Sequence, residues 1–234
     1  ERMPSSDIVY FGDIKNAPYG TKTQNELSAL TFGAFKRLID AGATSVVSAC
    51  NSASTTLAVS LLDAGDISSD RVIEMVGPTV RALKHADANI LLAATPATIE
   101  SGAYQNAFSM LGKKIETLAF PDLARAIEFN APEEEIERII RAGLETVPKG
   151  SFRILVLACT HYPLALPAFE RVLGSDVLIF DPADAVAERV VKEWWPREAG
   201  NGKLRSLISK YSPSFRRCGK EFCPKDANAV EVIE

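Results

Sequence analysis

Short apolar runs alternate with longer segments of helical periodicity along almost the whole chain. Several runs, such as Ile90–Ala94 and Ile154–Ala158, are apolar at every position, which is typical of strands covered on both faces. Strands that alternate with helices pair in parallel, with helices on both faces of the sheet. The pattern therefore predicts an α/β fold. The expected strands are Ile8–Phe11, Ser45–Ala49, Val72–Val76, Ile90–Ala94, Ile115–Phe120, Ile154–Ala158 and Val177–Phe180.

Two helix starts are indicated by their capping residues. The segment Thr23–Glu26 has the residues of a capping box, for a helix that runs to about Ala41 and stops at Gly42. The segment Pro132–Glu135 opens another helix, with proline in the first turn and acidic side chains at the positive end of the helix dipole.

A weak internal symmetry predicts two lobes. In each half a strand ends in a cysteine followed by small polar residues and a helix, with Cys50 in the first half and Cys159 in the second. A chain of 234 residues can form one large or two modest domains. The economical architecture is two similar lobes, each a mainly parallel sheet flanked by helices, with the active site in the cleft between them.

Composition and charge exclude some classes of function. The net charge of −4 and pI near 5.4 give no electrostatic footprint for nucleic acid. No apolar run reaches the length of about 18 residues that would indicate a membrane span. Four cysteines without a secretory signal indicate free thiols in a reducing compartment, here the cytoplasm. The start, Glu1–Pro4, leads almost at once into a strand, which suggests a trimmed or incomplete N-terminus rather than a targeting peptide.

The two strand-end cysteines are the strongest candidates for chemistry. Ligands of open parallel sheets bind at the carboxyl ends of the strands, and a helix start lowers the pKa of a thiol toward the reactive thiolate. Asn51, Ser52 and Thr160 add hydrogen-bonding side chains beside the thiols. A single cysteine of this kind more often packs in the core. The repetition, with His161 two residues after Cys159, favours catalysis.

Other cysteine chemistries fit the sequence less well. A zinc site needs closely spaced Cys and His residues, and the chain has two histidines, His85 and His161. A Cys–His hydrolase would leave the second thiol unexplained. Two thiols that converge from two lobes suit two-base racemisation or epimerisation, in which one group removes a proton from carbon and the other delivers one to the opposite face. Cys218 and Cys223 lie in a basic, irregular tail and are interpreted as incidental.

Five stretches of the chain resemble the cofactor-independent glutamate racemase family, within the aspartate/glutamate racemase superfamily. The resemblance holds in order and spacing from Asp7 to the C-terminus. Its most specific parts are Pro18–Gly20 and Cys159–Pro163, because aspartate and hydantoin racemases share the two cysteines but usually not these flanks. The five stretches are Val9–Asp13, Ala17–Lys22, Ala49–Ser54, Ala94–Ser101 with Tyr104, and Ala158–Leu164.

The resemblance implies a role for each matching residue. Cys50 would be the base for D-glutamate and Cys159 the base for L-glutamate, with His161 supporting Cys159. Glu128, on a helix expected over residues 122–129, would be a solvated charge if taken alone, but it falls where the family has a functional glutamate. The amino and carboxylate groups of the substrate would be held by Pro18, Tyr19, Gly20, Asn51, Ser52, Thr98 and Thr160.

The resemblance also implies the reaction and the division of the chain. The expected reaction interconverts L- and D-glutamate without metal or pyridoxal phosphate, supplying D-glutamate for peptidoglycan synthesis and so for cell-wall biogenesis and cell shape. Both chain ends would build the first lobe, from residues 1–74 and 183–234, and residues 75–182 would build the second. Glutamate is the expected partner, and a homodimer is one of several arrangements compatible with two-lobed subunits.

The largest departure from the family lies before Asp7. The family begins with a strand ending in Asp-Ser, a glycine-rich turn and a helix, and this sequence lacks that unit. Its absence is expected to expose apolar strand edges in the first lobe and to weaken stability. This departure allows two interpretations. The chain is a fragment of an ordinary racemase, which the intact thiol motifs favour, or it is a shortened relative that binds glutamate or a partner without turnover. A racemase of another acidic amino acid, such as aspartate, is a third hypothesis.

Overall fold

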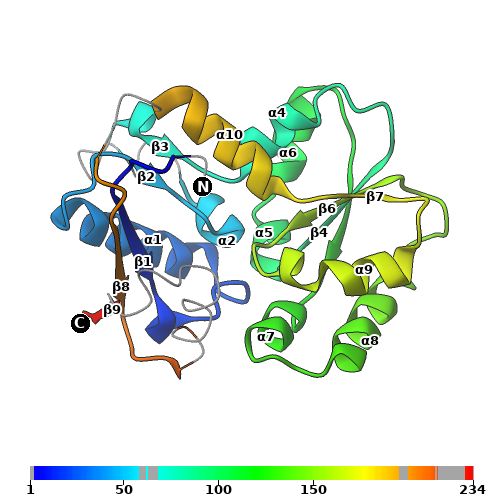
Figure 1. Cartoon of the computed structure of the whole chain (residues 1–234). Helices are drawn as coiled ribbons and strands as arrows, with labels where there is room; N and C mark the ends of the chain where they lie inside the picture. Colours follow the sequence, from blue (N-terminus) through cyan, green and yellow to red (C-terminus); the bar gives the residue numbers. More distant parts are fainter. Residues whose placement is uncertain are drawn as a thin grey trace.

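The computed structural model describes residues 3–57, 62, 68–194, 200–213, 215 and 230–233, and it consists of two α/β lobes side by side (Figure 1). Every strand pair in the described residues is parallel, and helices flank the strands. The predicted class of fold is therefore confirmed. Among the described residues, no helix combines the length and apolar character needed to cross a membrane.

The second lobe is built around a four-stranded sheet in the order β5-β4-β6-β7. Its central strands, β4 and β6, are buried at every position, as their continuous apolar sequences predicted. Alternate residues point to opposite faces of a strand, so the sheet has a core on each side. Leu91 and Ala93 pack with helices α7, α8 and α9, whereas Leu92 and Ala94 pack with α4 and α6. The bounds are β4 Ile90–Ala94, β5 Glu116–Ala119, β6 Ile154–Ala158, β7 Leu178–Phe180, α4 Val76–Ala82, α5 Pro96–Glu100, α6 Ala103–Met110, α7 Leu123–Glu128, α8 Glu133–Leu144 and α9 Leu166–Leu173.

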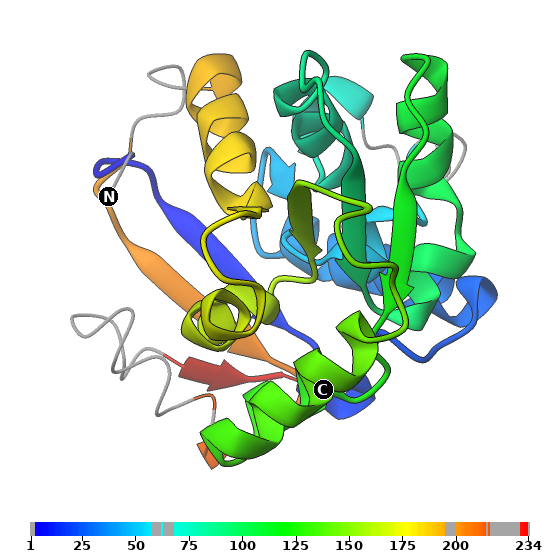
Figure 2. The same cartoon turned by 90° about the vertical axis from the view of Figure 1, so that its right-hand side faces the viewer.

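The described strands of the first lobe form two separate small sheets. Strands β1, β8 and β9 lie side by side (Figure 2), and β2 pairs with β3. No pairing joins β1 to β2 among the described residues. Ile8, Tyr10 and Val47 are 51%, 44% and 37% exposed, so β1 and β2 each carry exposed apolar side chains. The bounds are β1 Ile8–Gly12, β2 Val46–Val47, β3 Val72–Ile73, β8 Leu204–Ile208 and β9 Val230–Val232.

The helix ends agree with the sequence. Helix α1, Gln24–Asp40, begins with the predicted capping box, in which the Glu26 backbone N–H donates to Thr23 Oγ1 and the Thr23 N–H donates to the Glu26 carboxylate. It ends before Gly42, whose φ of +95° suits glycine. Helix α8 begins directly after Pro132, and α7 occupies most of the segment expected to be helical around Glu128.

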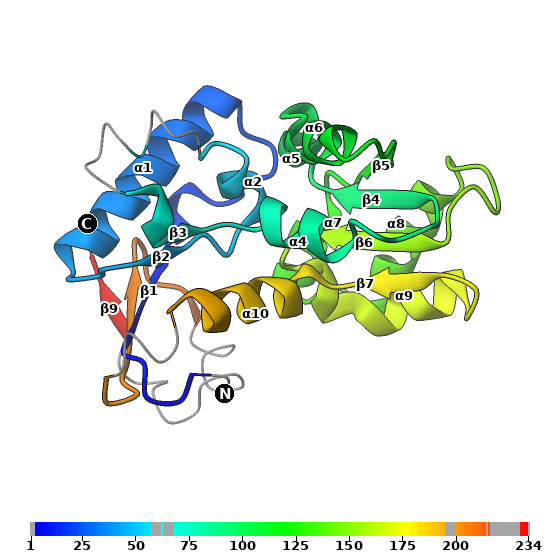
Figure 3. The ribbon, with the colours of Figure 1, turned by 90° about the horizontal axis from the view of Figure 1, so that it is seen from above.

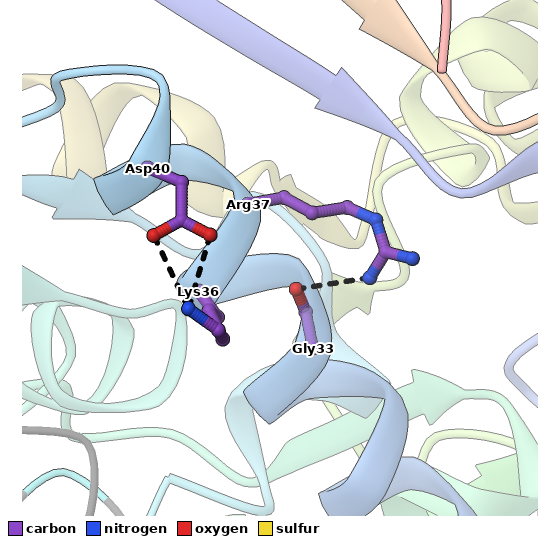
Figure 4. Close-up of polar contacts among 4 residues, drawn as sticks. All are labelled: Gly33, Lys36, Arg37 and Asp40. Carbon is purple, nitrogen blue, oxygen red and sulfur yellow. Dashed lines mark hydrogen bonds and ion pairs between the residues drawn. The ribbon is translucent and has the colours of Figure 1, made fainter. Parts of the chain in front are cut away.

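Polar contacts between successive turns of α1 are drawn in Figure 4. The Lys36 ammonium lies 3.1 Å from a carboxylate oxygen of Asp40, one turn away. Arg37 donates to the Gly33 carbonyl at 3.2 Å, and its guanidinium carbon lies 5.8 Å from the centre of the Phe11 ring. This cation–π contact links α1 to β1.

Two predicted strands were partly wrong. Of the strand expected over Ser45–Ala49, only Val46–Val47 forms β2. The segment expected to run to Val76 leaves the extended conformation after Ile73, and α4 begins at Val76. The reason is Glu74, whose carboxylate accepts hydrogen bonds from the backbone N–H groups of Val76 and Gly77 and so caps a helix start. Strands β8 and β9 were not predicted, because charged residues such as Arg205 and Glu231 interrupt their apolar pattern.

Helix α10, Pro182–Trp194, connects the lobes. Figure 3 shows it running from the end of β7 in the second lobe toward the first. Val186 packs with Ile73 of β3 and with Met75, which lies between β3 and α4, and the helix also contacts α4. The division at residues 74/75 and 182/183 stays a prediction.

Candidate active site

Each of the two predicted thiols lies at the start of a helical turn. Cys50 precedes α2, Asn51–Ser54, and the backbone N–H groups of Ser52 and Ala53 favour the ionised form of its thiol. Cys159 directly follows β6, and the N–H groups of His161 and Tyr162 act on its thiol in the same way. The same local geometry therefore occurs once in each lobe, as the repeated sequence pattern predicted.

The sequence predicted that the helix starts would lower the pKa of both thiols. This prediction was wrong, because the net shift of each pKa is upward. Burial raises the pKa of both, and it raises that of Cys159, which is 6% exposed, to about 12. The backbone N–H groups oppose this rise, but the loss of hydration is the larger effect. Negative charge on Cys50 further raises the pKa of Cys159.

His161 and Glu128 form a pair beside Cys159. The Nε2 atom of His161 lies 3.8 Å from a carboxylate oxygen of Glu128, at the end of α7. Burial lowers the pKa of His161, and the charge of Glu128 partly offsets this. Glu128 is therefore not an isolated solvated charge. It is positioned to influence the protonation of the imidazole.

Three buried hydroxyl groups join the lobes next to Cys50. Ser52 Oγ, on α2, lies 2.9 Å from Thr95 Oγ1 and 3.2 Å from Thr98 Oγ1. The two threonine hydroxyls lie 3.1 Å apart at the start of α5. Figure 3 shows α2 and α5 facing each other between the lobes. Thr98 has no exposed surface, so its hydroxyl belongs to this junction in the present arrangement.

Asn51 is held by the second lobe. Its Oδ1 atom accepts a hydrogen bond of 2.6 Å from the Tyr104 hydroxyl on α6. Its Nδ2 atom is buried and has no hydrogen-bond partner within the described part of the chain. An unpaired buried N–H group costs about 1–3 kcal/mol, so this amide is expected to serve a purpose other than packing.

The Pro18–Gly20 loop of the first lobe docks on α5 of the second. The Gly20 carbonyl accepts a hydrogen bond of 2.9 Å from the Ala97 N–H. A Cβ atom added to Gly20 would lie 2.7 Å from the Thr95 side chain, so only glycine allows this close approach. Pro18 is exposed.

Tyr19 is anchored by a half-buried acid, Asp13. Its hydroxyl donates to Asp13 at 2.6 Å, and Asp13 also accepts from Ser209 at 2.7 Å. Burial would raise the pKa of Asp13, but hydrogen bonds from Tyr19, Ser209 and Asn16 together lower it, so the carboxylate stays charged. Burial and the Asp13 contact raise the pKa of Tyr19, which stays a neutral donor.

The structure thus groups most of the predicted site residues at the junction of the lobes. Thr160 is exposed, and the structure gives it no distinctive contact to describe. No role was predicted from the sequence for Asp13, Thr95 or Tyr104, although all three lie in the stretches that carry the resemblance. Ser209 had no signal in the sequence, because only the pairing of β1 with β8 brings it beside Asp13. Cys218 and Cys223 lie outside the described residues.

Comparisons with known proteins agree with this geometry. Residues 1–190 match the family described as Asp/Glu/Hydantoin racemase. The chain is 30% identical to a glutamate racemase from Desulforudis audaxviator, covering 99% of this chain and 89% of that protein. It is 33% identical to a glutamate racemase from Clostridium perfringens, over 77% of this chain and 70% of the relative.

A solved structure extends the comparison to the fold. The crystal structure of a glutamate racemase isoform from Bacillus anthracis superposes with a TM-score of 0.87 at 26% identity, covering 99% of this chain and 89% of that one. The two-lobed architecture is therefore shared with known racemases. On the family match and these relatives, the chain belongs to the Asp/Glu/Hydantoin racemase family, whose members are isomerases.

Proposed function

We propose that this chain interconverts L- and D-glutamate by a two-base mechanism with Cys50 and Cys159 as the bases. The observation that carries the proposal is the pair of thiols, one from each lobe, each at the start of a helical turn whose backbone N–H groups favour the thiolate. Glutamate is the proposed substrate because relatives at 30% and 33% identity are glutamate racemases.

In the proposed reaction the α-carbon of the substrate lies between the sulfurs. One cysteine, as thiolate, accepts the α-proton, and the bond electrons remain on a planar carbanion. The opposite cysteine, as thiol, donates its proton to the other face, which inverts the configuration. The cysteines then hold exchanged protonation states, so no oxidant or further reactant is consumed. Cys50 would act on D-glutamate and Cys159 on L-glutamate.

The raised pKa of the thiols requires that substrate help to form the thiolate. The α-ammonium group of an amino acid brings a positive charge into the site, and a nearby opposite charge favours the ionised thiol. The N–H groups at each sulfur stabilise the same anion. We propose that the neutral His161 imidazole, with Glu128 behind it, assists proton movement at Cys159.

The polar groups at the junction of the lobes suit an amino acid with two carboxylates. Oriented amides and hydroxyls stabilise developing charge best where water is excluded. Asn51 and Ser52 are buried beside Cys50, and Tyr19 and Gly20 approach from the adjacent loop. The proposed substrate contacts are Pro18, Tyr19, Gly20, Asn51, Ser52, Thr98 and Thr160.

The proposed role is to supply D-glutamate for peptidoglycan synthesis in a bacterial cytoplasm, where free thiols persist. A homodimer is the proposed assembly, and light scattering of the purified chain would measure it.

Proton NMR in D2O tests the proposal directly. Each enantiomer of glutamate is incubated with the chain, and loss of the α-proton signal is followed. Loss from both enantiomers, abolished by Cys50→Ala and by Cys159→Ala, is the expected result. Racemisation that persists in either variant would overturn the two-thiol mechanism.

The same assay separates the competing functions. Binding of glutamate without exchange of its α-proton would favour a relative that binds but does not turn over. Faster exchange with aspartate than with glutamate would favour a racemase for a different acidic amino acid.

A further inference from the structure

Tyr104 contacts Asn51 but belongs to the other lobe. It lies on α6 with no exposed surface, whereas Asn51 opens α2 directly after Cys50 and is 2% exposed. The hydroxyl of Tyr104 and Oδ1 of Asn51 are 2.6 Å apart, within the usual range for an O–H···O hydrogen bond. A fully buried side chain of the second lobe therefore holds the residue next to a thiol of the first.

This contact decides which end of the amide faces Tyr104. The hydroxyl has one proton, and the Met75 carbonyl, which could also accept it, is 3.5 Å away, too far for a strong bond. Burial raises the pKa of Tyr104, so the hydroxyl keeps that proton. Donation to Oδ1 leaves the opposite end, Nδ2, as a buried donor without a partner in the described residues.

A rotation of the amide by half a turn would exchange the positions of its hydrogen-bond donor and acceptor with little change of shape. Nδ2 would then donate to Tyr104, and Oδ1, which repels carboxylate, would take the position of the donor. Nothing else in the described residues bonds the side chain of Asn51, so its orientation depends on the tyrosine hydroxyl.

We infer that Tyr104 is a positioning residue that fixes the Asn51 amide with its NH2 group available to a substrate carboxylate. The inference rests on the proposed function, because a carboxylate of the amino acid is the acceptor. Because Tyr104 belongs to the second lobe and Asn51 to the first, the orientation of the amide depends on contact between the lobes.

A double-mutant cycle tests the inference. In the wild-type background, Tyr104→Phe keeps the buried ring and is expected to raise the KM for both enantiomers roughly 2- to 10-fold, the equivalent of one hydrogen bond, with a smaller change in kcat. In the Asn51→Ala background, Tyr104→Phe is expected to change KM less than about 2-fold, because the residue through which it acts is gone. Equal effects in both backgrounds would overturn the inference.

A measurement that needs no turnover distinguishes this inference from the proposed function. The side-chain NH2 resonances of Asn51 are assigned by their loss in Asn51→Ala, and they are expected to shift and broaden in Tyr104→Phe. Titration with glutamate, followed on the same resonances, gives its affinity in each variant. Unchanged resonances or unchanged affinity in Tyr104→Phe would overturn the inference. Binding without proton exchange in the wild type would instead count against the proposed function.

Tyr162→Phe is the matched control. Its hydroxyl is also buried and donates to the Phe120 carbonyl at 3.2 Å. The Tm of this variant measures how much stability is lost when one buried tyrosine hydroxyl is removed. The Asn51 resonances are expected to stay in place. A shift of those resonances in Tyr162→Phe equal to that in Tyr104→Phe would show a general loosening and contradict the inference.

Discussion

The imidazole of His161 lies 3.8 Å from the carboxylate of Glu128, so the residue two positions after Cys159 has an acid from a different helix as its neighbour. Both side chains are more than one-third exposed, and solvent therefore weakens their attraction. The effect of the pair is to set the protonation of the imidazole rather than to stabilise the fold.

We predict that Glu128→Gln lowers the pKa of His161 further, because burial already lowers it and the opposing negative charge is removed. The imidazole resonances of His161, followed by NMR against pH, measure the change. Glu133→Gln, at an exposed acid that pairs with Arg171, is the control and should leave His161 unaffected. An unchanged His161 pKa in Glu128→Gln would show that the two groups do not interact in solution.

A second prediction concerns stability at mildly acidic pH. The pKa of His161 is lower in the folded state than its ordinary value of 6.5, so the unfolded state binds more protons below that pH. The contribution of the neutral imidazole is therefore present above pH 6.5 and is lost as the pH falls through the lowered pKa. His161→Gln should show a smaller drop in Tm than the wild type between pH 7.5 and 5.5.

The exposed His85 provides the comparison for this effect. His85→Gln should retain the wild-type loss of Tm on acidification. If His161→Gln and the wild type lose Tm equally over this range, the titration of His161 does not contribute to stability.

The third prediction concerns the close approach of Gly20 to Thr95. A Cβ atom at position 20 would lie 2.7 Å from the Thr95 side chain, a distance at which one segment must move. Gly20→Ala should lower the free energy of unfolding by about 1–3 kcal/mol, the usual cost of overpacking, and raise the KM for glutamate. Chemical denaturation and steady-state kinetics measure the two effects.

Gly33→Ala is the matched control for this glycine. Gly33 lies inside α1, and an added Cβ atom would meet only the flexible end of Arg37, at 3.3 Å. This variant should gain about 0.5–1 kcal/mol of stability from the lower entropy of the unfolded chain. Equal behaviour of the two variants would contradict the packing argument at Gly20.

The fourth prediction is that the first lobe opens more readily than the second. Strands β1 and β2 each have an edge unpaired within the described residues, whereas β4 and β6 are paired on both sides and buried throughout. Backbone amides in β1 and β2 should therefore exchange with deuterium faster than those in β4 and β6. Hydrogen exchange measured by mass spectrometry resolves these segments.

Thermal unfolding checks the same expectation for the whole chain. We expect a transition at low temperature, because the small sheets of the first lobe bury little apolar surface. A single cooperative transition at high temperature, with uniform exchange in all four strands, would contradict it.

Local sequence patterns specified much of the fold. The continuous apolar runs of β4 and β6 predicted strands covered on both faces, because only such strands need no polar side, and both strands are buried throughout. The capping box at Thr23 placed the start of α1, since its hydrogen bonds are made within four residues. Strands β8 and β9 could not be found in the same way, because their charged side chains face solvent and break the apolar pattern.

The candidate site shows a similar division between local and distant information. The repeated pattern around Cys50 and Cys159 identified both thiols, because a cysteine at a strand end followed by a helix start is a feature of contiguous residues. The net rise of their pKa values was not predictable in this way, since burial depends on every segment that covers the sulfurs. Likewise, the pairing of His161 with Glu128, of Asn51 with Tyr104 and of Asp13 with Ser209 depends on how the lobes and sheets come together. These contacts join residues 33, 53 and 196 positions apart, so long-range packing determines them and no local pattern encodes them.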